Sequence, residues 1–124
     1  MGKTVADDVL DGAFLVLDDS TKQVACSAQP TTYAEATSTY ALAIATMIAG
    51  TDFTKANGDT SGRKCTMAAK SGVLISTSGT ATHVALCDGS TLKYVTTCTS
   101  QALTANGSNT VNFPAWKIEI ADPT

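Results

Sequence analysis

Short stretches in which apolar and polar residues alternate, separated by turn-forming residues, constrain the fold of this chain most strongly. From Thr21 onward the side chains change character with a period of two, which is the period of a β-strand. Residues 57–62 and 88–90 are the clearest turn signals, because both contain Asp-Gly or Asn-Gly pairs with Ser close by. Many short strands with frequent turns predict a mainly β fold, an antiparallel β-sandwich. We expect strands within about 21–120, at 21–26, 42–47, 52–55, 63–69, 73–76, 80–87, 92–99 and 109–120.

One helix is predicted before the strands, over residues 4–17. Thr4 is a plausible N-cap, and the acids at 18 and 19 with Ser20 form the turn that ends the helix. We expect it to pack at one edge or end of the sandwich, and the whole chain of 124 residues to form a single domain, 1–124. Its apolar residues at helical spacing are Val5, Val9, Leu10, Ala13, Phe14 and Leu17.

The core of the sandwich is predicted from the apolar residues that share strand faces. We expect these side chains to be largely buried. They are Val24, Leu42, Ile44, Val84, Leu86, Leu92, Tyr94, Trp116 and Ile118.

Four cysteines, Cys26, Cys65, Cys87 and Cys98, stand singly along the chain. No two have the spacing of a zinc knuckle or a redox pair, and His83 is the only histidine. The cysteines therefore predict a structural role: buried thiols, disulfides within the chain, or crosslinks to a neighbouring subunit.

The hairpin around residues 88–90 separates two of these thiols. If those three residues form the loop, Leu86 faces Leu92 on the core side, and Cys98 continues that face. Cys87 then lies on the opposite, polar face, roughly 20 Å from Cys98 at about 3.3 Å per residue. We therefore expect Cys98 to be buried, together with Cys26, and Cys87 to be more exposed.

Motifs that would indicate an enzyme are weak. Residues 58–62 resemble the Gly-Asp-Ser-Gly of trypsin-like proteases with one residue inserted, and His83 alone would have to supply the base. Gly62-Arg63-Lys64 lacks the order and the context of a phosphate-binding loop. The acids of the N-terminal helix fit a solvated face better than a cation site. We expect no catalytic residue, cofactor or metal site, and hence no enzyme.

Charge and composition limit the classes of partner that the chain can be expected to bind. Only 15% of residues are charged, the net charge is −3 and there is no basic run, so no nucleic-acid partner is expected. Nor is a membrane partner expected, because no apolar stretch is long enough to cross a bilayer. The acidic N-terminus does not have the pattern of a cleaved signal. A threonine-rich surface with few charges fits either a protein packed against neighbours or an ordinary β-protein. The interface candidates are four aromatic residues, some of which we expect to contact other chains: Phe14, Tyr33, Tyr40 and Phe53.

Five segments together resemble a small protein encoded among the structural genes of tailed bacteriophages. The resemblance covers nearly the whole chain, and it implies a virion component: a head decoration, linking or neck-region protein. Its localisation would be the virion, which is assembled in the cytoplasm of the bacterial host. Within that particle the protein would be oligomeric. The segments are 26–37 (CSAQPTTYAEAT), 58–64 (GDTSGRK), 81–86 (ATHVAL), 94–103 (YVTTCTSQAL) and 111–124 (VNFPAWKIEIADPT).

The cysteines depart in part from the pattern of that family. Cys26 and Cys98 fit it, whereas Cys65 and Cys87 stand where valine is more common, and both lie near turns. We therefore expect Cys87 and Cys65 to be crosslink candidates to another virion subunit. A Cys65–Cys87 bond within one chain is the alternative.

Three functions follow as hypotheses. The first is a capsid decoration or cement protein, a minor capsid protein that binds the major capsid protein and reinforces the shell. The second is a neck, collar or tail component, or an exposed receptor-binding module. The third, ranked last, is a small phage hydrolase.

Overall fold

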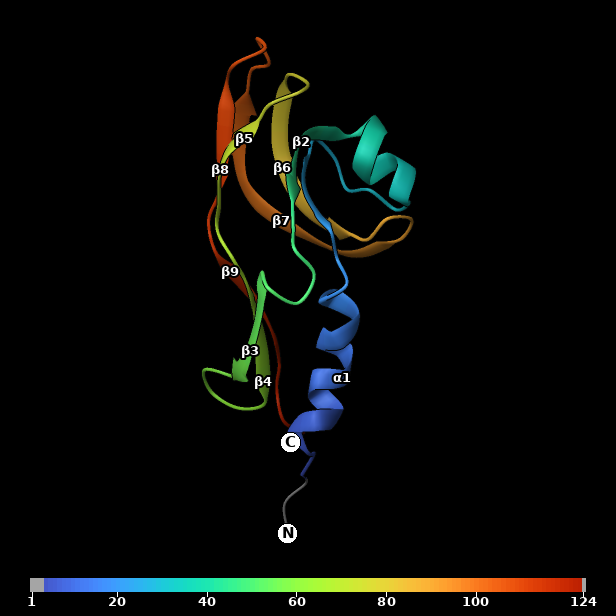
Figure 1. Cartoon of the computed structure of the whole chain (residues 1–124), viewed down its shortest axis with the longest axis vertical. Coiled ribbons are helices and arrows are strands. Elements are labelled where there is room, and N and C mark those ends of the chain that lie inside the picture. The colour runs from blue at the N-terminus through green and yellow to red at the C-terminus, as the bar shows by residue number, and fades with distance from the viewer. Residues whose placement is uncertain (1–3, 124) are drawn as a thin grey trace.

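The computed structural model describes residues 4–123, and it confirms a mainly β chain with antiparallel sheets and one short N-terminal helix (Figure 1). The helix is α1 (Asp7–Leu17), and a short π-helical segment, η1 (Glu35–Thr39), follows the first strand. The strands are β1 (Lys22–Cys26), β2 (Ala41–Thr46), β3 (Phe53–Asn57), β4 (Arg63–Met67), β5 (Lys70–Leu74), β6 (Gly79–Cys87), β7 (Leu92–Leu103), β8 (Thr110–Phe113) and β9 (Trp116–Ile120).

The largest sheet has the strand order β2-β1-β6-β7, and its inner strand β1 is buried on both faces. Because side chains alternate along β1, Ala25 points to the face covered by Phe113 of β8, whereas Val24 and Cys26 point to the other. The segment that contains η1 covers this second face with Ala36. The four-stranded sheet and the β5-β8 pair thus form the two layers of a sandwich.

A long antiparallel ribbon joins the two halves of the molecule. Met67 of β4 lies opposite Trp116 of β9, and Lys70 of β5 lies opposite Phe113 of β8, so the register is unbroken across the gap between the strands. Pro114 lies in this gap, where its missing N–H removes one ladder hydrogen bond. The single strand expected at 109–120 is therefore two strands, one in each half of the molecule.

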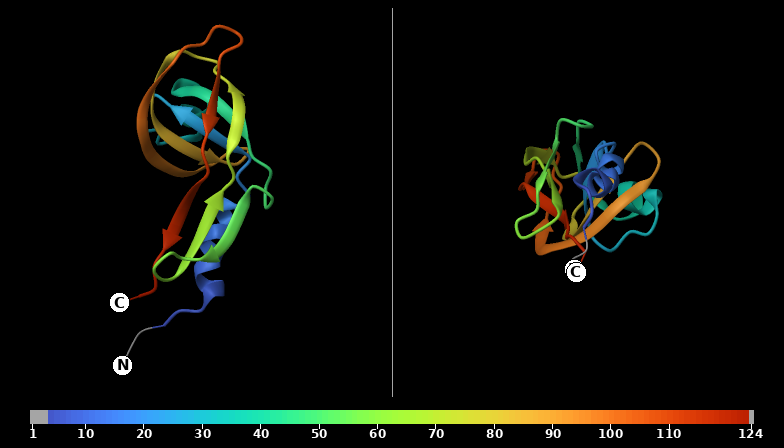
Figure 2. Two further views of the ribbon diagram at one scale, coloured as in Figure 1. Left: turned by 90° about the vertical axis from the view of Figure 1, so that its left-hand side faces the viewer. Right: turned by 90° about the horizontal axis from the view of Figure 1, so that it is seen from below.

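In the left view of Figure 2, the strands of the upper half curl into a cylinder. The bridge between Ala43 and Ile75 joins β2 to the end of β5, so the strands run β7-β6-β1-β2-β5-β8 around it. Within residues 4–123, no strand pairing joins β7 to β8. We call this unpaired boundary the seam.

Helix α1 lies at one end of the molecule beside the β3-β4-β9 sheet, as the sequence predicted (Figure 1). It begins at Asp7 with Ala6 as its N-cap, so the predicted start at Thr4 is wrong, and no side chain caps it. Phe14 and Leu17 pack into a second core with Met67 and Leu86.

The predicted core is confirmed for three buried side chains and differs at others. Ile44 is 37% exposed, because β2 is an edge strand and its outer face has little cover. The fully or nearly fully buried members are Val24, Leu42 and Leu86, and the partly buried members are Val84, Leu92, Tyr94, Trp116 and Ile118.

Candidate functional site

All four cysteines are free thiols, and two of them do not lie where the sequence predicted. Cys26 is fully buried, as expected. Cys87 and Cys65 are also fully buried, so the predicted exposure of Cys87 is wrong. Cys98, expected to be buried, is only partly so, and it is the most accessible of the four.

The position of Cys87 follows from the hairpin that comes after it. The loop has four residues, because the Asp88 carboxylate accepts hydrogen bonds from the backbone N–H groups of Ser90 (2.7 Å) and Thr91 (2.6 Å). Cys87 therefore pairs with Leu92, next to an irregularity in the register. The face that Cys87 shares with Cys26 is not polar but lies under the η1 segment.

Cys65 lies in the middle of β4, between Lys55 of β3 and Ile118 of β9. Its Sγ lies 3.9 Å from a carboxylate oxygen of Asp18, next to the end of α1. Burial is the main cause that raises the pKa of Cys65 to about 11, with the negative charge of Asp18 adding to it. The thiol is thus neutral and shielded.

Cys26 is still less reactive. Burial raises its pKa to about 12, and the neighbouring Cys87 and Cys98 contribute in the same direction. Cys65 and Cys87 belong to separate core clusters, which leaves no basis for a bond between them within one chain. Nor can either reach a neighbouring subunit without local unfolding, so the structure removes the argument for crosslinks through them.

Two of the four expected interface aromatics lie inside the chain's own core. Phe14 and Phe53 are buried among Met47, Cys65 and Leu86, so neither presents its ring to a partner.

The other two, Tyr33 and Tyr40, are partly buried against the η1 side of the large sheet. The Lys22 ammonium donates a hydrogen bond to the Tyr33 hydroxyl at 2.6 Å and lies 5.1 Å from the centre of its ring. Tyr33 therefore helps to hold the η1 segment on the sheet, whereas the two tyrosines remain interface candidates only through their exposed parts.

The sequence reasoning missed an apolar surface on α1. Val9, Gly12, Ala13 and Val16 follow the i, i+3, i+4, i+7 spacing of one helix face, and all four are exposed. Val9 is 67% and Val16 is 51% exposed, and a Cβ added at Gly12 would meet nothing within 4 Å. We call these four residues the outer strip. The signal was present, because apolar residues occupy more than one side of this helix.

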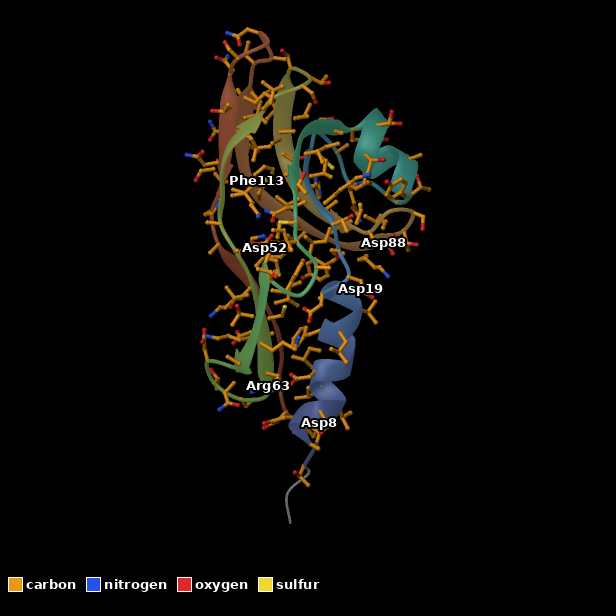
Figure 3. The ribbon with its side chains drawn as sticks, in the orientation of Figure 1. Asp8, Asp19, Asp52, Arg63, Asp88 and Phe113 are labelled. Atoms are coloured by element: carbon orange, nitrogen blue, oxygen red, sulfur yellow. The ribbon has the colours of Figure 1, made fainter. Side chains whose placement is uncertain are left out.

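Ion pairs fix the opposite side of α1. Arg63 lies on β4 beside α1 (Figure 3). Its guanidinium donates from Nε to the Asp11 carboxylate at 2.9 Å, and Lys55 of β3 pairs with Asp18 at the end of the helix. Residues 4–123 contain no group of three or more metal-ligating side chains. Of the surfaces described, the outer strip is therefore the best candidate for function.

Comparisons with known proteins give no relative. No protein-family model, no curated protein and no solved structure matches this chain. Over the described part of the chain, no helix is long and apolar enough to cross a membrane.

Proposed function

We propose that this chain is a non-enzymatic structural protein of a tailed-phage virion, a decoration or linking protein that binds the major capsid protein and reinforces the shell. The resemblance of five sequence segments to a small tailed-phage structural protein supports its placement in a virion. The observation that carries a binding role is the outer strip of α1.

A surface helix normally presents polar residues to water, and α1 does not do so along this strip. Its inner side is already packed through Phe14 and Leu17, so the strip is a second apolar face. Exposed apolar surface of this kind is typical of a protein interface.

The size of the strip suits repeated binding rather than one strong contact. Val9 and Val16 are 67% and 51% exposed, so burying the rest of both side chains contributes at most about 2–4 kcal/mol before the cost of association is subtracted. A contact of that strength is weak alone, but many copies on a capsid lattice reinforce the shell together. Crosslinks through Cys65 or Cys87 play no part in this proposal, since both thiols are buried.

The test is immunogold labelling of purified virions with antibodies raised against this chain. Gold over the whole head is the expected result, with antibodies against the tail as the control for specificity. Gold confined to the neck or tail would replace the decoration role with the neck or collar alternative. A virion preparation that contains none of the chain would contradict the proposal.

A further inference from the structure

An apolar cavity lies behind the seam between β7 and β8. It consists of two adjoining hollows of about 300 and about 230 Å³, which share Val84, Cys98, Phe113 and Pro114 as walls. An apolar cavity of about 150 Å³ is enough to hold a benzene ring. Each hollow therefore has room for one apolar side chain.

Two polar groups border the smaller hollow. The Gln23 side chain is 1% exposed, and its Oε1 accepts no hydrogen bond from any residue between 4 and 123. The indole Nε1–H of Trp116 likewise has no acceptor within the described chain. Leaving such buried groups unpaired costs about 1–3 kcal/mol each. One unpaired acceptor and one unpaired donor, both shielded from solvent, thus belong to residues that line the same apolar space.

The mouth of the cavity is bounded by strand edges. Among the residues that the structure describes, β7 is the last strand of its sheet and β8 pairs only with β5, so both present unpaired backbone groups towards the seam. Exposed Thr99, Gln101 and Asn112 line this mouth, and no charged side chain lines either hollow.

We propose that the seam binds an extended, uncharged segment of a neighbouring polypeptide, which inserts one apolar side chain into the cavity. One residue of an extended segment supplies what the site lacks, because its N–H and C=O point to the same side of the strand, so that the N–H can donate to Gln23 Oε1 and the C=O can accept from Trp116 Nε1. An added strand also pairs with the free edges, the mode known as β-augmentation. This inference rests on the proposed function only for the partner being a virion subunit.

The chain carries two reporters of occupancy. Trp116 is the only tryptophan, so its fluorescence reports on the smaller hollow directly. Cys98 lines both hollows and is the most accessible thiol, so its rate of reaction with a disulfide reagent reports on shielding. Both are measured on purified protein, independently of any virion.

The experiment titrates the protein with acetyl-Thr-Leu-Thr-amide and three matched peptides. In these the central Leu is replaced by Gly, is replaced by Asp, or carries a methyl group on its nitrogen. We expect the Leu peptide to shift Trp116 emission and slow the reaction of Cys98. The other three should bind at least about tenfold more weakly, since each lacks the side chain, neutrality or N–H that the site needs.

Two variants identify the role of Gln23. Gln23→Met keeps the volume but removes the acceptor, and we expect about tenfold weaker peptide binding. Its thermal midpoint should not fall, because an unpaired buried polar group is lost. Gln29→Met, an exposed loop position outside the cavity, is the matched control and should bind normally.

Four results would overturn the proposal. One is equal binding of the Gly and Leu peptides, and another is unchanged binding by Gln23→Met. The third is a titration in which 3-methylbutan-1-ol protects Cys98 as well as the Leu peptide does, which would indicate a small-molecule cavity. If no peptide binds and a crystal structure places only water between Gln23 and Trp116, the seam is a hydrated gap. None of these results bears on immunogold labelling of virions, so the two proposals fail separately.

Discussion

Arg63 and Asp11 join strand β4 to helix α1 through two contacts, Nε to Oδ1 at 2.9 Å and Nη2 to Oδ2 at 3.2 Å. A paired guanidinium and carboxylate fix geometry as well as charge. Asp11 faces the sheet, so the pair acts together with the buried Phe14 and Leu17 to hold the rotation of α1 that leaves Val9 and Val16 exposed. Apolar burial and an ionic contact on the opposite side thus hold the outer strip outward together.

Asp11→Asn should loosen α1 from the sheet. The amide cannot provide the second charged contact to Arg63, so we expect faster hydrogen exchange of α1 amides and a lower thermal midpoint. The neighbouring Asp8 is exposed, and Asp8→Asn is the matched control. Equal exchange in the two variants would show that the Arg63 pair does not position the helix.

Phe14→Ala should destabilise the protein by about 3–5 kcal/mol, because a fully buried aromatic ring leaves a cavity in the core that it shares with Leu86. Leu15→Ala, at a position that is 58% exposed, should change the free energy of unfolding by less than about 0.5 kcal/mol. Urea denaturation measures both. A small effect at Phe14 would contradict the packing of α1 described above.

The thiols should react in the order of their exposure. We expect a disulfide reagent to modify Cys98 first in the folded protein, and Cys65 and Cys87 only after unfolding. Mass spectrometry of peptides after brief treatment identifies the modified residue. Modification of Cys87 ahead of Cys98, or a reductant-sensitive dimer of this chain in virions that is lost in a Cys87→Ala variant, would restore the crosslinking hypothesis.

Stability should fall in alkaline solution partly because of Cys26. Burial raises the pKa of this thiol from 9.0 to about 12, so the folded state keeps a proton that the unfolded chain releases. The contribution of the Cys26 thiol to the free energy of unfolding is complete below pH 9 and is lost as the pH rises towards 12. The free energy of unfolding can be measured with urea at several values between about pH 9 and pH 11. Cys26→Ala should reduce the slope of this free energy against pH by the equivalent of up to about one proton. An unchanged slope would mean that Cys26 is already ionised or exposed.

The sequence predicted the fold class and the end position of the helix because periodicity depends on local sequence. It failed at Cys87 because two non-local facts decide that position. The Asp88 side chain bonds lengthen the hairpin loop to four residues, and the polar segment around η1 folds over a face that was expected to meet solvent. No pattern in residues 31–39 indicates which surface they cover.

The same limit applies to the interaction surfaces. The helical spacing of Val9 and Ala13 placed them on the inner face, but the helix buries Phe14 and Leu17 and turns the first two outward. The seam was also beyond prediction, because it depends on which strands remain unpaired. Gln23 and Trp116 are far apart in sequence, and only the folded chain brings them to one cavity.

The most direct test of the proposed function is incorporation of α1 variants into virions. Val16→Lys places a charge in the outer strip, and Leu74→Lys makes the same kind of change at an equally exposed position, 51% in both cases, on β5. With both variants folded by circular dichroism, quantitative electrophoresis of purified particles gives the number of copies per virion. We predict that Val16→Lys is depleted at least about tenfold whereas Leu74→Lys is incorporated normally. Normal incorporation of Val16→Lys would contradict the claim that the outer strip of α1 binds the virion.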